Sequence, residues 1–196
     1  MEHNPRNIRI AVLLGSVRPD NYTEKVASVL LDEFRKRGVT LEVYNPAGRT
    51  LAQPGLGDTA DSKELQRMVR EAAGVVLATP EYHGSYSSVM KQMIENMGFP
   101  SALKGKPVGL LGVAAGSIGA IKALEHLRSV VSHVGGHPLP GVVSVAFVQK
   151  AFTAQGELTD PRTEKIVRSL AGNLMDYLKA HVCPGIALEE LLRKSA

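Results

Sequence analysis

The chain has a single cysteine, Cys183, and no run of apolar residues long enough to cross a membrane. One cysteine excludes an intrachain disulfide framework and a metal site built from several thiolates. A membrane-spanning helix needs about 18 or more consecutive apolar residues. Residues 1–7 are polar and lack the apolar core of a signal peptide. We therefore expect a cytoplasmic protein with no membrane partner.

Aromatic residues are also scarce, at 5% of the chain, although the formal net charge is +4 and the isoelectric point is about 9.2. Nucleic-acid-binding proteins concentrate Lys and Arg on one face and often interleave aromatic side chains. Here the basic residues are dispersed, and the densest group is Arg35, Lys36 and Arg37. That group falls at an expected helix C-terminus, where cations suit the helix dipole. The charge therefore favours a small anionic ligand over nucleic acid.

Short apolar runs alternate with helical patterns along all 196 residues. Such alternation indicates βαβ units and a parallel sheet, and right-handed crossovers place helices on both of its faces. The expected strands are residues 8–14, 39–44, 75–79, 107–114 and 142–148. We predict an α/β three-layer sandwich with a five-stranded parallel sheet of order 2-1-3-4-5. It forms a single domain over residues 1–196, with a core at about 8–181 and a short C-terminal extension, 182–196.

Local signals set the expected boundaries of several elements. Pro80 is expected to end the third strand, and Gly116 to open the helix that follows the fourth strand. A short helix is expected after Pro184. The stripe of Met90, Met93 and Met97 at helical spacing indicates packing in the core or at an interface.

Ligands of such sheets bind beyond the carboxyl ends of the strands, so the loops after strands one, three and four are the candidate site. The first loop, residues 15–23, follows a strand and opens a helix. Amide groups at a helix N-terminus bind anions, and Arg18 can bind a phosphate bidentately. A plain βα turn capped by Asn21 or Thr23 is the alternative, but an Arg within a first turn rich in Ser, Asn and Thr favours a phosphate site. The loop is neither a G-x-G-x-x-G fingerprint nor a Walker A motif.

Each of the other two loops could accept a flat ligand. The second, residues 80–87, carries Pro80, Gly84 and two tyrosines directly after strand three. Its backbone donors could meet the edge of a planar heterocycle, although Tyr and His in a loop are usually surface packing. The third loop, residues 112–119, is rich in small residues that let a flat ligand approach the backbone. Tight helix–sheet packing explains those small residues equally well.

Three segments in order, GSVR with a following NYT, then PEYHGS, then GKPVGLLGVAAGSIGA, resemble the NADPH-dependent FMN reductase family. This family includes azo, quinone and chromate reductases. The resemblance covers about residues 8–152, and each motif stands at a strand end. It implies a flavodoxin-like fold, one FMN per subunit, NADPH or NADH as co-substrate, and a homodimer or homotetramer.

The resemblance also implies which residues hold the cofactor. They are Ser16, Arg18, Asn21, Tyr22 and Thr23 in the phosphate loop, Pro80, Glu81, Tyr82, His83, Gly84 and Ser85 beside the isoalloxazine, and Ala115, Gly116, Ser117 and Gly119 on its other side. Three positions depart from the family pattern. The family often has Ser where Asn21 stands, Asn where His83 stands, and a Trp near Asn96, in a helix that often builds the subunit interface.

The implied chemistry belongs to the cofactor, which takes a hydride from a nicotinamide and passes electrons to an acceptor. We expect a ping-pong cycle ending on a quinone, an azo compound, a metal ion, free flavin or oxygen. No catalytic side chain is expected, and no metal site, because His126, His133 and His137 lack ligand spacing. The helix expected from Gly116 would direct its positive end at the flavin.

Two other classes of protein fit the same motifs. One is a flavodoxin-like electron carrier or FMN-binding module without its own nicotinamide reaction. The basic isoelectric point favours the enzyme, because carriers of this fold are typically strongly acidic. The other is a nucleotide-binding or transferase domain that shares the fold without the flavin, since fold alone does not fix function.

Overall fold

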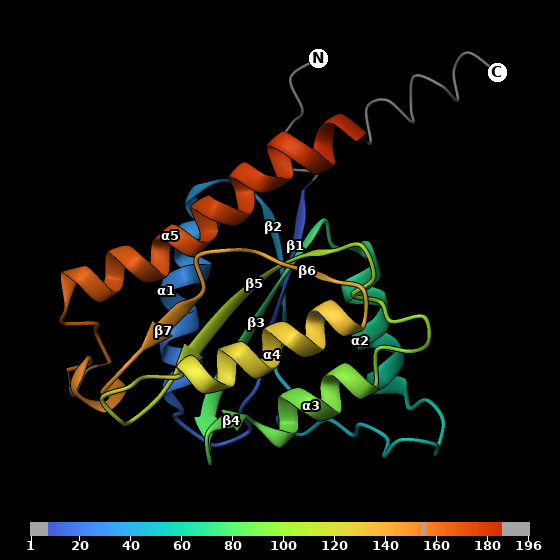
Figure 1. The fold of residues 1–196 in the computed structure, drawn as a ribbon, viewed down its shortest axis with the longest axis horizontal. Coiled ribbons are helices and arrows are strands. Elements are labelled where there is room, and N and C mark those ends of the chain that lie inside the picture. The colour runs from blue at the N-terminus through green and yellow to red at the C-terminus, as the bar shows by residue number, and fades with distance from the viewer. Residues whose placement is uncertain (1–7, 154–155, 186–196) are drawn as a thin grey trace.

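A computed structural model describes residues 8–153 and 156–185 of the chain. Its centre is a parallel sheet in which the strands follow the predicted order (Figure 1). Across the sheet these are β2 (Thr40–Tyr44), β1 (Arg9–Leu14), β3 (Gly74–Tyr82), β5 (Pro107–Val113), and then β6 (His137–Pro138) and β7 (Val143–Val145), which both pair with β5. The order 2-1-3-4-5 is thus confirmed, with two short strands sharing the fifth position. The count of five strands is wrong, because these two and β4 (Ser85–Tyr86) bring the described sheet to seven.

Helices cover both faces of the sheet, which confirms the three-layer prediction (Figure 1). On β1, Ile10, Val12 and Leu14 belong to one core cluster, and Ala11 and Leu13 to the other. This alternation follows from the two-residue period of a strand, and it makes the strand apolar throughout. The first cluster lies under α1 (Tyr22–Lys36) and α5 (Pro161–Tyr177), and the second under α2 (Ala60–Glu71), α3 (Ser88–Glu95) and α4 (Ile121–His133). The methionine stripe is fully buried in the second cluster, as its spacing indicated.

The third strand does not end before Pro80. It continues to Tyr82, and Pro80 itself pairs in register with Val113 of β5. Proline cannot donate a ladder hydrogen bond, so it is tolerated where a strand leaves the sheet. Beyond Pro80 the chain turns back into β4, and residues 81 and 82 pair antiparallel with 86 and 85. The segment after Pro80, expected to be a loop, is therefore a hairpin.

Two other boundaries were also placed wrongly. The helix after β5 begins at Ile121 and not at Gly116, because Gly119 has a φ of +73°, which no helix residue adopts. Ile118, which stands at helical spacing from Ile121 and Leu124 in the sequence, lies in the loop before the helix and is 72% exposed. The fifth strand, expected over residues 142–148, is only three residues long. Phe147 has a φ of +46° and ends the extended backbone before the 3₁₀ turn η2 (Val148–Lys150).

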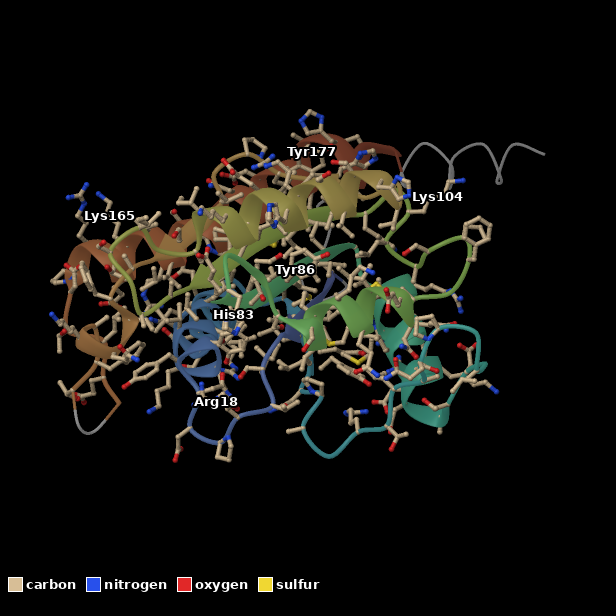
Figure 2. The ribbon with its side chains drawn as sticks, turned by 60° about the horizontal axis from the view of Figure 1, so that its bottom comes forward. Arg18, His83, Tyr86, Lys104, Lys165 and Tyr177 are labelled. Carbon is tan, nitrogen blue, oxygen red and sulfur yellow. The ribbon has the colours of Figure 1, made fainter. Side chains whose placement is uncertain are left out.

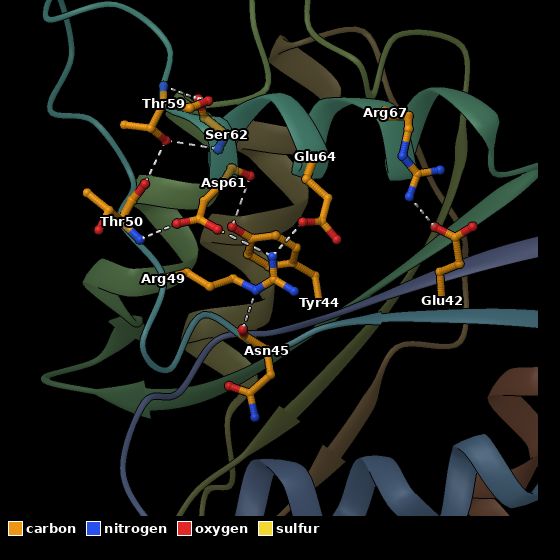
Figure 3. A network of polar contacts seen from close by, with 10 residues as sticks. All are labelled: Glu42, Tyr44, Asn45, Arg49, Thr50, Thr59, Asp61, Ser62, Glu64 and Arg67. Atoms are coloured by element: carbon orange, nitrogen blue, oxygen red, sulfur yellow. Dashed lines mark hydrogen bonds and ion pairs between the residues drawn. The ribbon is translucent and has the colours of Figure 1, made fainter.

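A polar network holds the long loop of residues 45–59 against α2 (Figure 3). The Arg49 guanidinium lies 4.5 Å from the Tyr44 ring centroid and pairs with Glu64 at 2.9 Å. The Thr50 amide donates to Asp61 at 2.7 Å. Burial raises the pKa of the Tyr44 phenol, which donates to the Asp61 carbonyl oxygen at 3.2 Å. This loop has no helix or strand of its own, yet it is anchored at several points.

The C-terminal part of the described chain is a continuation of α5. The π-helical turn η3 (Leu178–Val182) extends it, and Leu178 is fully buried. The predicted extension, residues 182–196, and the short helix expected after Pro184 fall mainly on residues 186–196, which lie outside the described residues. No helix in the described ranges is both long and apolar enough to pass through a membrane.

One junction joins the carboxyl end of β1 to the carboxyl end of β3. The Gly15 amide donates to the Ala78 carbonyl oxygen at 2.7 Å, and the buried Ser87 hydroxyl donates to the Gly15 carbonyl oxygen at 2.6 Å. Ser87 also caps α3 by accepting from the Met90 amide at 3.0 Å. A Cβ on Gly15 would lie about 3 Å from the Ala78 carbonyl oxygen and from the Ser87 hydroxyl, so a side chain has no room there.

Replacing Ser87 by Ala should lower the free energy of unfolding by about 1–3 kcal/mol. The substitution removes a helix cap and leaves the Gly15 carbonyl buried without its partner. The midpoint of urea unfolding measures this loss. Ser88→Ala is the matched control, because Ser88 is exposed at the first residue of the same helix. Equal midpoints for the two variants would contradict the role given to Ser87.

Candidate functional site

The first loop, residues 15–21, ends in the N-terminus of α1. Asn21 caps the helix, because its side-chain oxygen accepts from the Glu24 amide at 2.8 Å. Its side-chain amide donates to the Arg18 carbonyl oxygen at 2.8 Å, which closes the loop. The cap satisfies only one of the free amides of the first turn, so those of Tyr22 and Thr23 remain as donors toward an anion. The alternative of a local cap is therefore observed for Asn21, and it leaves the amides of Tyr22 and Thr23 free.

Arg18 supplies the charge of this loop. Its side chain is exposed, and within the described residues it has no ion pair, whereas Arg49, Arg67 and Arg168 each pair with a carboxylate. Figure 2 shows Arg18 and His83 at the same edge of the fold. An unpaired guanidinium beside free helix amides is suited to a phosphate.

The second loop is the tip of the β3–β4 hairpin. His83 and Gly84 have φ angles of +52° and +75°, so both central residues are left-handed, as a type I′ turn requires. Asn-Gly is favoured in this turn, which gives a structural reason for the Asn that the family often has where His83 stands. The hairpin lies against α4, where the Ser85 hydroxyl is 3.0 Å from His126 Nδ1. Burial raises the pKa of the Tyr86 phenol, which therefore stays protonated at neutral pH.

The third loop joins β5 to α4 over residues 114–120. Gly112, at the end of β5, passes so close to the helix that a Cβ would lie 2.6 Å from the Ala120 Cβ. A Cβ on Gly119 would lie 2.4 Å from the Ser144 hydroxyl. Gly116, by contrast, has no atom within 4 Å of such a Cβ. Helix–sheet packing therefore explains Gly112 and Gly119, while Gly116 borders open space.

These three loops and the segment after β7 surround one cavity of about 320 Å³ at the carboxyl edge of the sheet. That volume is at the lower end of the range of ligand pockets. The lining residues are Arg18, Pro19, Asp20, Asn21, Tyr22, Thr23, Pro80, Glu81, Tyr82, Val113, Ala114, Ala115, Val148 and Gln149. The cationic group of Arg18 and the free amides of Tyr22 and Thr23 come from the first loop. Other lining residues come from the ends of β3 and β5.

The cavity brings together part of the predicted set. Its wall includes Arg18, Asn21, Tyr22, Thr23, Pro80, Glu81, Tyr82 and Ala115. The other predicted residues, Ser16, His83, Gly84, Ser85, Gly116, Ser117 and Gly119, are not among its lining residues. Ser16 is buried beneath the first loop, where its hydroxyl accepts from the Arg18 amide at 3.4 Å. Gly116 and Ser117 are exposed next to Ala115.

Sequence reasoning missed two parts of this wall. Val113 and Ala114 lie inside the third candidate loop, residues 112–119, but were not named as site residues, and Val148 and Gln149 follow β7, a strand whose loop was not considered. The signal was available, because the carboxyl ends of all parallel strands meet at one edge. Within the described residues there is no cluster of His, Cys, Asp or Glu able to hold a metal ion.

Comparison with known protein families assigns the chain to one of them. The model of the NADPH-dependent FMN reductases matches residues 8–150, which is most of the chain. The chain belongs to this family. It is therefore an NAD(P)H-dependent oxidoreductase of the FMN reductase type, with FMN as cofactor and NADPH as co-substrate.

Individual members of the family and solved structures agree. An FMN-dependent NADPH-azoreductase of Staphylococcus haemolyticus is 31% identical over 137 residues, which are 66% of this chain and 72% of that protein. The solved structure of FerB, a flavoenzyme NAD(P)H:(acceptor) oxidoreductase from Paracoccus denitrificans, has a TM-score of 0.74 at 26% identity and covers 89% of this chain and 98% of its own. A flavodoxin from Streptococcus pneumoniae shares the fold alone, with a TM-score of 0.56 at 17% identity, covering 86% of this chain and 97% of its own.

The hairpin tip provides a test of its own geometry. Gly84→Ala should cost about 1–2 kcal/mol of unfolding free energy, since an L side chain is strained at a φ of +75°. Space is not the cause, because the nearest atom to the new Cβ is the Lys122 Cδ at 3.7 Å. Gly116→Ala, which meets open space at an ordinary φ, is the control and should be nearly neutral. Denaturant unfolding of the two apo variants checks this, and a neutral Gly84→Ala would rule out the left-handed turn.

Proposed function

We propose that the cavity at the carboxyl edge of the sheet holds FMN, with the phosphate on the first loop and the ring between the hairpin and the third loop. The observation that carries the proposal is the unpaired Arg18 beside the free first-turn amides of α1, in a cavity that the ends of β3 and β5 also line. The residues proposed to contact the cofactor are the predicted site residues that also line the cavity. The other predicted residues do not line the cavity, and we propose that they surround it. They are Ser16, His83, Gly84, Ser85, Gly116, Ser117 and Gly119.

Bound FMN supplies the redox chemistry, taking a hydride from NADPH and giving electrons to the acceptor. The chain's own residues bind and orient it. Arg18 and the amides of Tyr22 and Thr23 hold the phosphate, and Pro80 and Ala115 border the ring. Tyr82 is 40% exposed and stands where a second planar molecule would enter. We propose that the nicotinamide and the acceptor use this place in turn, in a ping-pong cycle.

The proposed acceptor is a small planar aromatic molecule, an azo compound or a quinone. The support is the exposed aromatic side chain of Tyr82 and the small residues at 114–116, which leave a flat molecule access to the ring. The azoreductase named among the relatives is similar in sequence to this chain. A metal ion, free flavin or oxygen would need no such platform and serve as comparison acceptors.

A cytoplasmic location and a homodimer or homotetramer are proposed from the family resemblance. Asn96, near the position where the family often has Trp, is buried. Its side chain accepts from the Ala52 amide at 3.0 Å and donates to the Ala52 carbonyl oxygen at 2.9 Å. It thus anchors the long loop of residues 45–59, and does not present a surface to a partner.

Replacing Arg18 by Ala should weaken FMN binding by about 1.5–3 kcal/mol, the range for a hydrogen bond to a charged group. Quenching of FMN fluorescence in a titration of the apo protein measures the affinity. Arg35→Ala is the control, since Arg35 carries the same charge but lies in the last turn of α1, at the end of that helix away from the cavity. An equal loss of affinity in the two variants would show only the effect of net charge and would remove the phosphate assignment.

Anaerobic addition of NADPH to the FMN-loaded protein should bleach the flavin absorption, and addition of a quinone or azo compound should restore it. Restoration after removal of the oxidised nicotinamide, with parallel lines in steady-state double-reciprocal plots, is the expected sign of a ping-pong cycle. A flavin that stays oxidised under NADPH and NADH would instead indicate an electron carrier that needs a separate reductase.

A further inference from the structure

Glu81 occupies an unusual place between the hairpin and α4. It is the next-to-last residue of β3, pairs with Tyr86 across the hairpin and lines the cavity. Its side chain leaves the strand, and the Oε2 atom accepts from the Ala123 backbone amide at 3.1 Å. Ala123 is the third residue of α4. A residue that lines the cavity therefore also caps α4.

The helix needs this cap because its own sequence provides none. The residue at the N-cap position is Ala120, which has no hydroxyl, amide or carboxylate to accept from the first turn. The Ala120 amide donates instead to the Ser144 hydroxyl of β7 at 2.8 Å. Two side chains from strands on either side of β5 thus satisfy the start of α4, and together they fix the loop that precedes it.

The charge of Glu81 also matters, apart from its hydrogen bond. The N-terminus of a helix carries a partial positive charge, which a carboxylate at this position offsets. Within the described residues Glu81 has no ion pair, so no cation neutralises it. We expected the positive end of α4 to point at the flavin, but this carboxylate caps it. Because Glu81 lines the cavity, the same carboxylate places a negative charge in the cavity wall.

We propose that Glu81 is a positioning residue with two effects on the flavin site. Its hydrogen bond to Ala123 holds the hairpin and the loop of residues 114–120 at a fixed separation, and its charge disfavours added electron density on a ring bound between them. The proposal rests on FMN occupying the cavity. Because reduction increases the electron density of the flavin, the carboxylate lowers the reduction potential of the bound cofactor relative to an uncharged side chain.

Glu81→Gln separates the charge from the hydrogen bond, since the amide oxygen of Gln can still accept from Ala123. The affinity for oxidised FMN should stay within about threefold of the wild type. The ratio of affinities for reduced and oxidised FMN should rise about tenfold, which is about 30 mV for a two-electron couple. Equilibration of the holo protein with a reference dye under a reducing system measures the potential.

Glu125→Gln is the matched control for charge. Glu125 is exposed on the same helix, two residues beyond Ala123, and does not line the cavity. Its loss changes the net charge equally, so the potential should move by less than a third as much. Equal potentials for the two variants, or no shift in Glu81→Gln, would overturn the electrostatic part of the proposal.

Glu81→Ala tests the hydrogen bond. It should lower the unfolding temperature of the apo protein and weaken FMN binding, and Glu81→Gln should restore most of both. If Ala and Gln behave alike in these two measurements, the positioning role is wrong. Failure of the wild-type protein to bind FMN would contradict the proposed function itself. The unfolding temperatures of the apo variants would still test whether Glu81 caps α4.

Discussion

The hydroxyl group of Ser87 connects the parts of this molecule on which the site depends. It holds the first loop through the Gly15 carbonyl and starts α3 through the Met90 amide. The Ser87 amide in turn donates to the Thr79 hydroxyl within β3 at 3.1 Å. All of these groups are shielded from water, where an unpaired polar atom is costly. The first loop and the hairpin therefore cannot move apart without breaking several hydrogen bonds together, and this holds two of the segments that line the cavity in place.

Much of the fold follows from sequence alone because the strands are buried on both faces. Continuous apolar runs such as that of β1, separated by helical stripes, leave a parallel sheet covered by helices as the arrangement that buries them all. The boundaries that failed share a physical cause. Pro80 and Gly116 are local signals, and the surrounding backbone overruled each of them: β3 continues past Pro80 into its pairing with β4, and the left-handed Gly119 keeps residues 116–119 out of the helix. Ile118 is a third case: it stands at helical spacing from Ile121 in the sequence but lies in the loop before the helix.

The site was predictable in place but not in detail. Its loops follow strands, so the edge of the sheet at which they meet could be named in advance, and Arg18 could be singled out by its charge. The contact between Glu81 and Ala123 could not, because it joins residues 42 positions apart and depends on the hairpin register. Gln149 was missed for a similar reason. The left-handed backbone of Phe147, which turns the chain toward the cavity, has no signature in a β-rich stretch.

The third loop shows why its helix must be capped from elsewhere. Ala114, Ala115 and Gly116 are small, and only small side chains let a flat ligand reach the backbone beside β5. The N-cap residue of α4, Ala120, lies further along the same loop and likewise has no side-chain acceptor. Ser144 and Glu81 supply acceptors from neighbouring strands, at the cost of placing a carboxylate on the cavity wall. The loop that leaves a ring access to β5 thus ends in an N-cap without an acceptor, and the Glu81 carboxylate that supplies one also lines the cavity.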